Sequence, residues 1–478
     1  MIQIPVLRKG RPYYSVDRSV TVHHKTREPF VQISIANSGL IRRDLLDLPA
    51  IAEAMGKFTC AELIQLCERA SKHFLEDELP LGEGTQTVQD YVEQTSATTG
   101  SPWVMVRRNM EKIGGVMGNI SGVLRGLTRN LDLSILDAGW GEASGSVVSY
   151  FRRGDSLGVV LPSNSPGVHS LWVPAFVLKT PLILKPGSAE PWTPYRIIQA
   201  FIRAGAPPEC FGYYPAEHAG GGEILRRCGR GMVFGDVGTM KAYANDPRIE
   251  LHGPGWSKIV IGEDLIDHWR DYIDIIAASI AENSGRSCVN ASGVWVPRHA
   301  DAIAEALAEK LARIQPRAAS DPAAEIAPFA DPAVAGRINT MVEQGIQTEP
   351  GATDVTATYR PEGRLAEFEG CSYLLPTIIR VDSPEHSMAN KEYLFPFASV
   401  VETPQSTMPE VLGPTLVLTA ITNDPAFRAR LLRSNHIGRL NFGPIQTNRI
   451  VWDQPHEGNL FDHLYARRAF QAVELQPA

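Results

Sequence analysis

A cysteine on a short polar run is the residue of this sequence that is best suited to covalent chemistry. Cys288 follows Ser-Gly-Arg-Ser, and an apolar stretch that begins at Gly293 is expected to form a strand. The thiol is therefore expected on a loop that enters a strand, where reactive groups are often mounted. A thiolate adds to a carbonyl carbon and gives a tetrahedral adduct from an aldehyde or a thioester. Because a lone cysteine is more often a small buried apolar residue, this interpretation depends on its partners.

Two short motifs earlier in the chain are candidate partners. Leu161 to Pro166 is expected to be a strand end followed by a helix start, where the Asn164 amide is placed to donate to a developing oxyanion. One such donor lowers a barrier by about 3 to 4 kcal/mol. Leu182 to Ser188 is expected to be a strand that ends in Lys185, at the sheet edge where a nucleotide ribose would lie. Each motif also has an ordinary interpretation, as a helix N-cap and as a solvated lysine.

The elements that must position these residues alternate between strands and helices. Strands are expected at 157–161, 181–184, 232–234 and 259–261, and helices at about 169–178 and 194–204. This alternation predicts a parallel, doubly wound sheet that is covered on both faces. Such sheets bind ligands at the carboxyl ends of their strands. Gly220 to Gly222 is expected to be a flexible loop, since no Lys-Ser/Thr follows to make it a phosphate cradle.

A second α/β unit is expected from about residue 264. Its elements are a long helix at 265–282, the Cys288 loop, a strand at 293–297 and a helix at 301–314. The Ala/Pro-rich stretch 318–335 is expected to be a surface connection. The domains are therefore expected at residues 1–262 for cofactor binding, 263–437 for catalysis and 438–478 for a C-terminal segment with one return strand near 439–442.

Composition bounds the possible functions. The 478 residues, 44% hydrophobic and 21% charged, are typical of a globular chain of two or three domains. The net charge of -7, without a basic stripe, argues against nucleic acid as a partner. Six scattered cysteines without a CxxC pair predict no metal site and no disulfide framework, so a reducing cytoplasm is expected. No export signal or apolar run of about 18 residues is visible, so we expect no membrane span.

The order of the motifs resembles that of the aldehyde dehydrogenase superfamily over roughly residues 155 to 445. Each motif is weak alone, and the series is specific. Gly158 to Pro166 is similar to the family's oxyanion strand, and Leu182 to Lys185 to its ribose-binding lysine strand. Phe234-Gly235-Asp236 is similar to its phosphate-facing turn, and Glu282 to Cys288 to its nucleophile segment. Glu392 to Phe397 is similar to its second ribose clamp.

This resemblance implies a Rossmann-like cofactor domain and an α/β catalytic domain of aldehyde dehydrogenase type. It implies that Cys288 attacks the carbonyl of a small aldehyde or acyl thioester, while Asn164 and the Cys288 backbone N–H hold the oxyanion. It also implies that Glu392 binds the nicotinamide ribose, and that the protein is a homodimer or homotetramer to which the C-terminal segment contributes. The tail Trp452 to Phe461 is expected to line either the substrate mouth or a subunit contact.

The chain departs from the family at the residue that releases the acyl group. Hydrolytic members use the glutamate of a Glu-Leu-Gly-Gly run as the base for water, and this chain has Glu250-Leu-His-Gly253. A literal match selects Glu250 but inserts a residue before the strand at 259–261. A match without a gap puts Leu251 at the position of the family's glutamate, with His252 beside it.

Members that exchange the acyl group with coenzyme A do not need this base, because a thiol is itself a good nucleophile. The run Lys185 to Pro194 and the pair His252-Gly253 also look more like the acyl-CoA reductase branch, which acts on fatty acyl thioesters. The sequence therefore favours interconversion of an aldehyde and an acyl-CoA, with coenzyme A as co-substrate. The alternatives are a hydrolytic enzyme that uses Glu250 as base and a non-catalytic scaffold member of the family.

Further departures concern the cofactor. Many NAD-preferring members carry a glutamate three positions after the ribose-binding lysine, and here Ser188 stands there, which does not repel a 2'-phosphate. NAD and NADP therefore both remain open. Asp236 replaces a small hydroxyl residue beside Gly235, where a carboxylate caps a helix well but opposes a pyrophosphate. Ser163 takes the place of a usual tryptophan beside Asn164.

Overall fold

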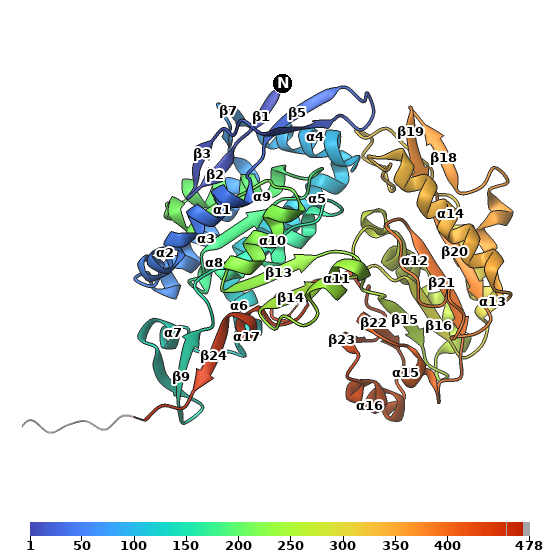
Figure 1. Cartoon of the computed structure of the whole chain (residues 1–478). Helices are drawn as coiled ribbons and strands as arrows, with labels where there is room; N and C mark the ends of the chain where they lie inside the picture. The colour runs from blue at the N-terminus through green and yellow to red at the C-terminus, as the bar shows by residue number, and fades with distance from the viewer. Residues whose placement is uncertain (456, 472–478) are drawn as a thin grey trace, which may run out of the picture.

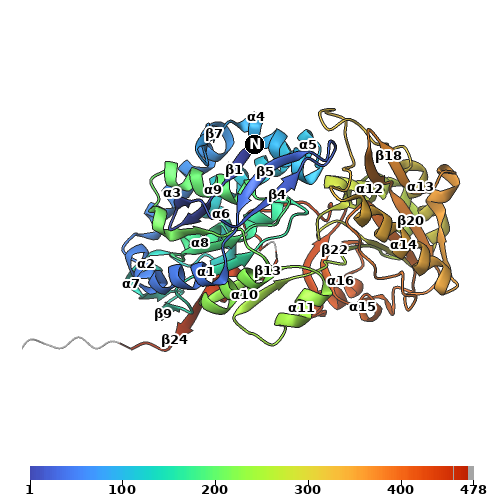
Figure 2. The same cartoon turned by 45° about the horizontal axis from the view of Figure 1, so that its top comes forward.

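The computed structural model describes residues 1–455 and 457–471 of the chain. Two units, each built on a seven-stranded sheet, lie side by side in both views (Figures 1 and 2). The first unit runs from the N-terminus to β14, and the second begins at β15. None of the helices in the described ranges is long and apolar enough to span a bilayer.

The first sheet has the strand order β14-β13-β10-β11-β12-β2-β3. Its parallel strands are β10 (Leu157–Val160), β11 (Leu182–Lys185), β12 (Phe211–Tyr213), β13 (Arg230–Phe234) and β14 (Ile249–His252). The antiparallel strands β2 (Val6–Arg8) and β3 (Arg11–Tyr13) close one edge. The parallel core that the sequence predicts is confirmed, with strand bounds shifted by one or two residues.

Helices cover both faces of this sheet, because its strands are apolar on both sides. Leu182 and Leu184 pack in one core, while Ile183 between them packs in another with Ile224 of α10. The helices of the unit are α1 (Ser38–Asp44), α2 (Leu48–Met55), α3 (Cys60–Glu76), α4 (Val88–Thr99), α5 (Trp103–Gly118), α6 (Ile120–Thr128), α7 (Ser134–Ala138), α8 (Pro174–Val177), α9 (Trp192–Arg203), α10 (His218–Arg227) and α11 (Val237–Tyr243).

Two expected elements of the first unit differ in the structure. The glycine run 220–222 is not a flexible loop, since it lies inside α10. A Cβ at Gly221 would stand 3.2 Å from Lys185 Cδ, so the glycine lets the helix approach the lysine that ends β11. The helix expected at 169–178 is instead a 3₁₀ turn, η2 (Pro166–Leu171), followed by α8. Pro174 lacks a backbone N–H and therefore starts a new helix.

The second sheet has the order β17-β20-β21-β16-β15-β22-β23. All of its pairings except β17 with β20 are parallel. Its strands are β15 (Lys258–Ile261), β16 (Gly293–Val296), β17 (Ala352–Asp354), β20 (Thr377–Val381), β21 (Phe397–Glu402), β22 (Thr415–Ile421) and β23 (Ile437–Phe442), and its helices are α12 (Ile273–Ala281), α13 (Ala300–Leu311), α14 (Pro332–Thr348), α15 (Met408–Val411) and α16 (Pro425–Arg433).

One strand belongs to a different sheet from the one expected. The strand at 259–261 was expected to continue the first sheet, but β15 pairs with β16 and β22 in the second. The chain passes between the sheets at 253–257, earlier than the expected boundary after residue 262. A short apolar run shows that a strand is buried on both faces, but it does not show which neighbours bury it.

The connection 318–335 is not a simple surface loop. Ala324, Ile326 and Ala327 are buried. The Arg286 guanidinium donates hydrogen bonds to the carbonyl oxygens of Ala327 at 3.1 Å and Pro328 at 2.6 Å. The Ala/Pro-rich segment therefore packs against the loop that carries Cys288, which composition alone did not indicate.

Smaller sheets complete the fold. A three-stranded sheet projects from the first unit beside α7 (Figure 1), and its strands are β8 (Trp140–Ala143), β9 (Ser146–Arg152) and β24 (Tyr465–Arg468), the last preceded by α17 (Leu460–Leu464). We call this sheet the arm. The remaining strands are β1 (Ile2–Ile4), β4 (Arg18–Val22), β5 (Pro29–Ser34), β6 (Leu79–Leu81), β7 (Gly84–Gln86), β18 (Leu365–Phe368) and β19 (Cys371–Leu374).

Candidate active site

Cys288 lies on a loop between α12 and β16, after the 3₁₀ turn η5 (Glu282–Gly285). Three successive residues of this turn have a left-handed backbone, with φ of 53° at Asn283, 59° at Ser284 and 63° at Gly285. Such a conformation is unfavourable for a side-chain-bearing residue and persists only where neighbours hold it. Asn109 Nδ2 donates to Asn283 Oδ1 at 2.8 Å, and Ala327 N donates to Ser284 Oγ at 2.9 Å. Neighbouring segments therefore fix the turn before the cysteine.

The Cys288 backbone is held by the segment that joins the two sheets. Ser257 Oγ donates to the Cys288 carbonyl oxygen at 2.8 Å. A Cβ at Gly255 would clash with that same oxygen, so only glycine permits this approach. The passage from β14 to β15 thus fixes the position of the thiol.

Asn164 reaches the Cys288 loop from the end of β10. Its Nδ2 donates to the Arg286 carbonyl oxygen at 2.9 Å. The N-cap of the following turn η2 is Ser165, whose hydroxyl accepts from Gly167 N at 3.4 Å. The N-cap interpretation of Asn164 is therefore wrong, and its amide points toward the Cys288 loop.

A cavity of about 590 Å³ lies between the two units at the carboxyl ends of β10, β13 and β14. Six of the nine predicted site residues line it, namely Cys288, Asn164, His252, Gly235, Asp236 and Glu392. The other three, Glu250, Lys185 and Ser188, are not among the described residues that line this cavity. The structure thus brings together residues that lie far apart in the sequence.

The side chains of β14 alternate between its faces. Leu251 packs with Met240 and Tyr243 of α11, while Glu250 and His252 face the other side. The His252 ring stacks on Phe234, with centroids 4.6 Å apart and an interplanar angle of 18°. The imidazole thus lines the cavity that contains Cys288, whereas Glu250 lies behind it.

Glu457 is a site residue that the sequence analysis missed. Its Oε2 lies 2.9 Å from His252 Nδ1, and Glu250 Oε1 lies 3.8 Å from His252 Nε2. Burial lowers the pKa of His252, but the charges of the nearby Glu457 and Glu250 carboxylates outweigh this effect and raise it. The available signal was the polar, aromatic run from Trp452 to Phe461, which contains this carboxylate.

Gly458 allows the C-terminal segment to approach β14. A Cβ at this position would clash with Glu250 Oε1, and the backbone φ of 62° also favours glycine. Burial raises the pKa of Glu250 above its ordinary value. The segment around 457–458 therefore closes a buried cluster of two carboxylates and one imidazole.

Three charged groups act on the Cys288 thiol. Burial raises its pKa well above the ordinary value, and the carboxylates of Glu457 and Glu392 add to the rise. The Lys112 ammonium of α5 acts in the opposite direction. Lys112 is a second residue that the sequence analysis missed, and burial lowers its own pKa. Burial and the two carboxylates therefore favour the neutral thiol of Cys288 over the thiolate.

Glu392 enters the cavity just before β21. Its Oε2 accepts a hydrogen bond from Trp256 N at 2.6 Å. Burial raises the pKa of Glu392 to about 7, although the Trp256 and Gly255 N–H groups and the charge of Lys258 oppose the rise. Burial likewise lowers the pKa of Lys258 to about 7. This carboxylate can accept hydrogen bonds from hydroxyl groups most strongly when it is ionised.

The remaining cofactor candidates lie at the edge of the first sheet. Val160 and Lys185 are register partners, so the ends of β10 and β11 adjoin. Lys185 Nζ donates to the Pro186 carbonyl oxygen at 3.2 Å, and burial lowers its pKa. Ser188 is exposed, and its carbonyl oxygen accepts from Thr21 Oγ1 at 3.2 Å. These two residues flank the cavity rather than line it.

Asp236 caps α11, as the sequence predicts. Its Oδ1 accepts from Thr239 N at 2.8 Å and from Thr239 Oγ1 at 2.9 Å, and these hydrogen bonds lower the pKa of the carboxyl group. The helix N-terminus is thus already neutralised by a carboxylate that would repel a pyrophosphate. The ribose and nicotinamide half of a dinucleotide fits the residues of this cavity, and its pyrophosphate must avoid Asp236.

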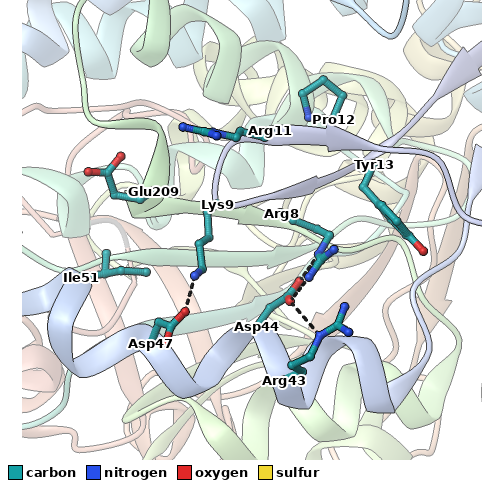
Figure 3. Close-up of a pocket in the computed structure, with 10 residues that line it drawn as sticks. All are labelled: Arg8, Lys9, Arg11, Pro12, Tyr13, Arg43, Asp44, Asp47, Ile51 and Glu209. Atoms are coloured by element: carbon teal, nitrogen blue, oxygen red, sulfur yellow. Dashed lines mark hydrogen bonds and ion pairs between the residues drawn. The ribbon is translucent and has the colours of Figure 1, made fainter.

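A larger cavity, of about 870 Å³, lies at the β2–β3 edge of the first sheet (Figure 3). Its cations are mostly paired, since Arg8 bonds Asp44 at 2.6 Å and 2.7 Å and Lys9 pairs with Asp47. None of the residues predicted to act chemically lines it. Its size therefore does not make it the catalytic centre.

The fold and the site together define a class of protein: an α/β chain in which a parallel, nucleotide-type sheet with the Asn164 amide at the end of β10 faces a second sheet, and a loop leading into that second sheet carries Cys288. The model of the aldehyde dehydrogenase family matches residues 87–408, which is more than half of the chain. The chain belongs to the aldehyde dehydrogenase family.

Individual relatives are distant. A betaine aldehyde dehydrogenase of Cereibacter sphaeroides (strain ATCC 17025 / ATH 2.4.3) is 24% identical over 252 residues, which cover 50% of each protein. The chain spans about half the length of the curated relatives it matches. The aldehyde dehydrogenase KauB from Pseudomonas aeruginosa has a TM-score of 0.80 at 15% identity, covering 98% of this chain and 96% of that one. The NAD-dependent aldehyde dehydrogenase from Sinorhizobium meliloti has a TM-score of 0.79 at 16% identity, and the match covers 100% of this chain and 96% of that one.

Proposed function

We propose that this enzyme interconverts an aldehyde and an acyl-CoA through a thioester on Cys288, with NAD or NADP as hydride carrier and coenzyme A as co-substrate. One observation carries this proposal. His252, held by Glu457, lines the cavity of Cys288, whereas Glu250, the carboxylate in the family's water-activating motif, lies behind it. An imidazole suits proton transfer to and from a thiol near neutral pH.

The residues support the following sequence of steps. The Cys288 sulfur bonds to the carbonyl carbon, its proton passes to His252, and the oxyanion is held by Asn164 Nδ2 and the Cys288 N–H. A nicotinamide dinucleotide bound in the cavity supplies the hydride acceptor in this direction and the donor in reverse. Loss of hydride from the carbon leaves an acyl thioester. His252 releases its proton to solvent and then takes that of coenzyme A, whose sulfur displaces the Cys288 thiolate.

The same residues are proposed to hold the cofactor. Glu392 would bind the nicotinamide ribose and Lys185 the adenosine ribose. Gly235 and Asp236 would lie beside the pyrophosphate, with Asp236 forcing it away from the start of α11. Ser188 is exposed and uncharged, so it leaves room for a 2'-phosphate and admits NADP as well as NAD.

Steady-state assays with a medium-chain aldehyde and NAD(P)⁺, with and without coenzyme A, test this proposal. We expect continuous turnover only with coenzyme A, and without it a single burst of reduced cofactor that matches the number of sites. His252→Gln is expected to slow both the burst and coenzyme A-dependent turnover by about 10²-fold to 10⁴-fold, because His252 takes a thiol proton in each step. Continuous turnover of the native enzyme without coenzyme A would contradict the proposal.

A hydrolytic reaction is the second candidate, because Glu250 has the raised pKa that a general base needs and lies 3.8 Å from His252. In that case Glu250→Gln would abolish turnover in water, while His252→Gln would act only on the geometry. A non-catalytic scaffold is the third, and the joint presence of Cys288, Asn164, Lys185 and Glu392 argues against it.

We also propose a homodimer or homotetramer in the cytoplasm. The arm exposes Trp140, Val147 and Phe151, which are 46%, 45% and 41% accessible, and an apolar sheet of this kind is commonly covered by a second subunit. All six cysteines are unpaired, as suits a reducing compartment.

A further inference from the structure

A second cavity, of about 340 Å³, lies on the other side of the Cys288 loop. Ser287 lines both cavities, and Val289, the residue after Cys288, lines only the second. Asn164 lines the first cavity, and its neighbour Ser165 lines the second. The cysteine and its oxyanion donor therefore form the wall between a cofactor cavity and a second cavity that substrate can occupy.

One face of α5 supplies cations to this second cavity. Met105, Arg108, Asn109 and Lys112 line it, and their three- and four-residue spacing puts them on the same side of the helix. Lys112 is half-buried and forms no ion pair with any carboxylate of residues 1–455 and 457–471. A half-buried ammonium without a carboxylate partner is costly, and it suits a site that binds an anion.

The opposite wall adds more donors. Asn448 Nδ2 is buried and has no hydrogen-bond partner among the described residues. Arg449 follows it, and the Arg439 guanidinium donates to the Arg449 carbonyl oxygen and so holds this wall in place. The described carboxylate that lines the cavity is Glu282, which stands 3.8 Å from Arg108. Three cations and an unused amide donor thus face one carboxylate.

We propose that this cavity binds an anionic group, a carboxylate or a phosphate, carried on the far end of the aldehyde or acyl substrate. The anion sits between Arg108, Arg449 and Asn448, in the same cavity that the Lys112 ammonium lines. This inference rests on the proposed function, because it assumes that the carbonyl of the same molecule meets Cys288. It departs from the apolar chains that the acyl-CoA reductase resemblance implies.

Binding measurements test the anion site without requiring turnover. In Cys288→Ser protein we expect calorimetric titration to show binding of glutarate and none of its uncharged diamide. Arg108→Gln and Arg449→Gln are each expected to weaken glutarate binding about tenfold or more, as loss of a charge-assisted hydrogen bond would. Arg107→Gln is the matched control, since this exposed neighbour bonds Gln89 and does not line the cavity.

Three results would overturn the inference. Glutarate does not bind, or it binds the Arg108 and Arg449 variants as well as the parent, or only adenosine 3',5'-bisphosphate binding is weakened in them. The last result would mean that the cations hold the phosphates of coenzyme A and not the acyl group.

A kinetic experiment compares two aldehydes of the same chain length as substrates, 5-oxopentanoate and pentanal. We expect native kcat/KM to favour the carboxylate by tenfold or more, and Arg108→Gln to lower the ratio of the two kcat/KM values toward one. A native enzyme that prefers pentanal would overturn the inference. If no aldehyde is turned over and glutarate still binds, the proposed function fails and the anion site stands.

Discussion

Two carboxylates and one ammonium surround the Cys288 thiol. Glu457 and Glu392 raise its pKa and Lys112 lowers it, so each charge can be tested through the reactivity of the sulfur. We expect Glu457→Gln to lower the thiol pKa, because removing a nearby negative charge favours the thiolate. The variant should then be alkylated by iodoacetamide faster than the parent at any pH below the parent's thiol pKa.

The pH dependence of the alkylation rate measures this effect. Glu305→Gln, an exposed carboxylate of α13, is the control and should leave the profile in place. An unchanged profile in Glu457→Gln would mean that Glu457 does not act on the sulfur.

Asn164 is expected to act on the transition state rather than on the fold. Its amide makes one hydrogen bond to the Arg286 carbonyl oxygen, so Asn164→Ala should change the free energy of unfolding by only about 1 kcal/mol. Because the same amide is proposed to hold the oxyanion, kcat should fall about 10²-fold to 10³-fold. Denaturant titration and single-turnover kinetics measure the two effects. A kcat within twofold of the native value would remove Asn164 from the oxyanion site.

If Glu392 binds the nicotinamide ribose as proposed, its titration gives cofactor binding a pH dependence of known sign. Burial raises its pKa to about 7 from 4.5, so the carboxyl group is protonated below pH 7 and ionised above it. Only the ionised form accepts both ribose hydroxyl protons, so NAD(P)H affinity should increase as the pH rises through 7. Fluorescence titration at pH 5.5 to 8.5 measures this. Glu392→Gln should bind more weakly and without the pH step, and an identical step in the variant would assign the titration to another group.

At the scale of elements, the site depends on the close approach of the C-terminal segment to β14. Gly458→Ala adds a Cβ that clashes with Glu250, and it also strains a backbone with φ of 62°. Gly370→Ala is the matched control, with φ of 76° and no atom within 4 Å of the added carbon. Both variants should lose about 1 to 2 kcal/mol from backbone strain.

Beyond that strain, the two variants should differ in stability and in turnover. Gly458→Ala should lose additional stability and turnover because Glu250 and His252 must shift, whereas Gly370→Ala should keep native turnover. Denaturant titration and steady-state assays compare them, and equal losses in both would mean that the approach of the segment to β14 is unimportant.

The alternation of apolar runs and amphipathic helices predicted the parallel core because the apolar residues of each strand alone show that the strand is buried. The sheet membership of β15 could not be predicted, since four buried residues do not identify their partners. The glycine run 220–222 was misjudged because its reason is tertiary, namely the approach of α10 to Lys185. Local sequence shows what an element is more readily than what it contacts.

The same distinction holds for the site. Cys288 and Asn164 could be predicted to lie together because each ends or precedes a recognisable strand, and their motifs keep a family order. Glu457 and Lys112 were missed because neither belongs to such a motif, and each acts on the thiol only through the folded arrangement. The choice between Glu250 and His252 required the folded cavity, because the pleat of β14 puts both residues on the face opposite Leu251 and only His252 lines the cavity of Cys288.

For the whole molecule, the arm is the expected subunit contact. Val147→Glu places a charge on its exposed apolar face and should convert a dimer or tetramer into monomers that still react at Cys288. Val16→Glu is the control, because Val16 is 95% accessible and lies outside the arm. Light scattering during size-exclusion chromatography measures the mass. A native protein that is already monomeric would contradict this expectation.

The pairing of β24 with β9 joins two stretches of chain that are separated by the parallel strands of the first sheet and by the whole second unit. During synthesis, β9 leaves the ribosome long before its partner strand, and the Glu457 side chain arrives after the thiol it will influence. Contacts of such long range are slow to form. A nascent chain that has completed both large sheets therefore still presents an open arm and an unfinished proton-transfer cluster. We expect interrupted translation to leave folded but inactive chains that chaperones must recognise by the unpaired edge of β9.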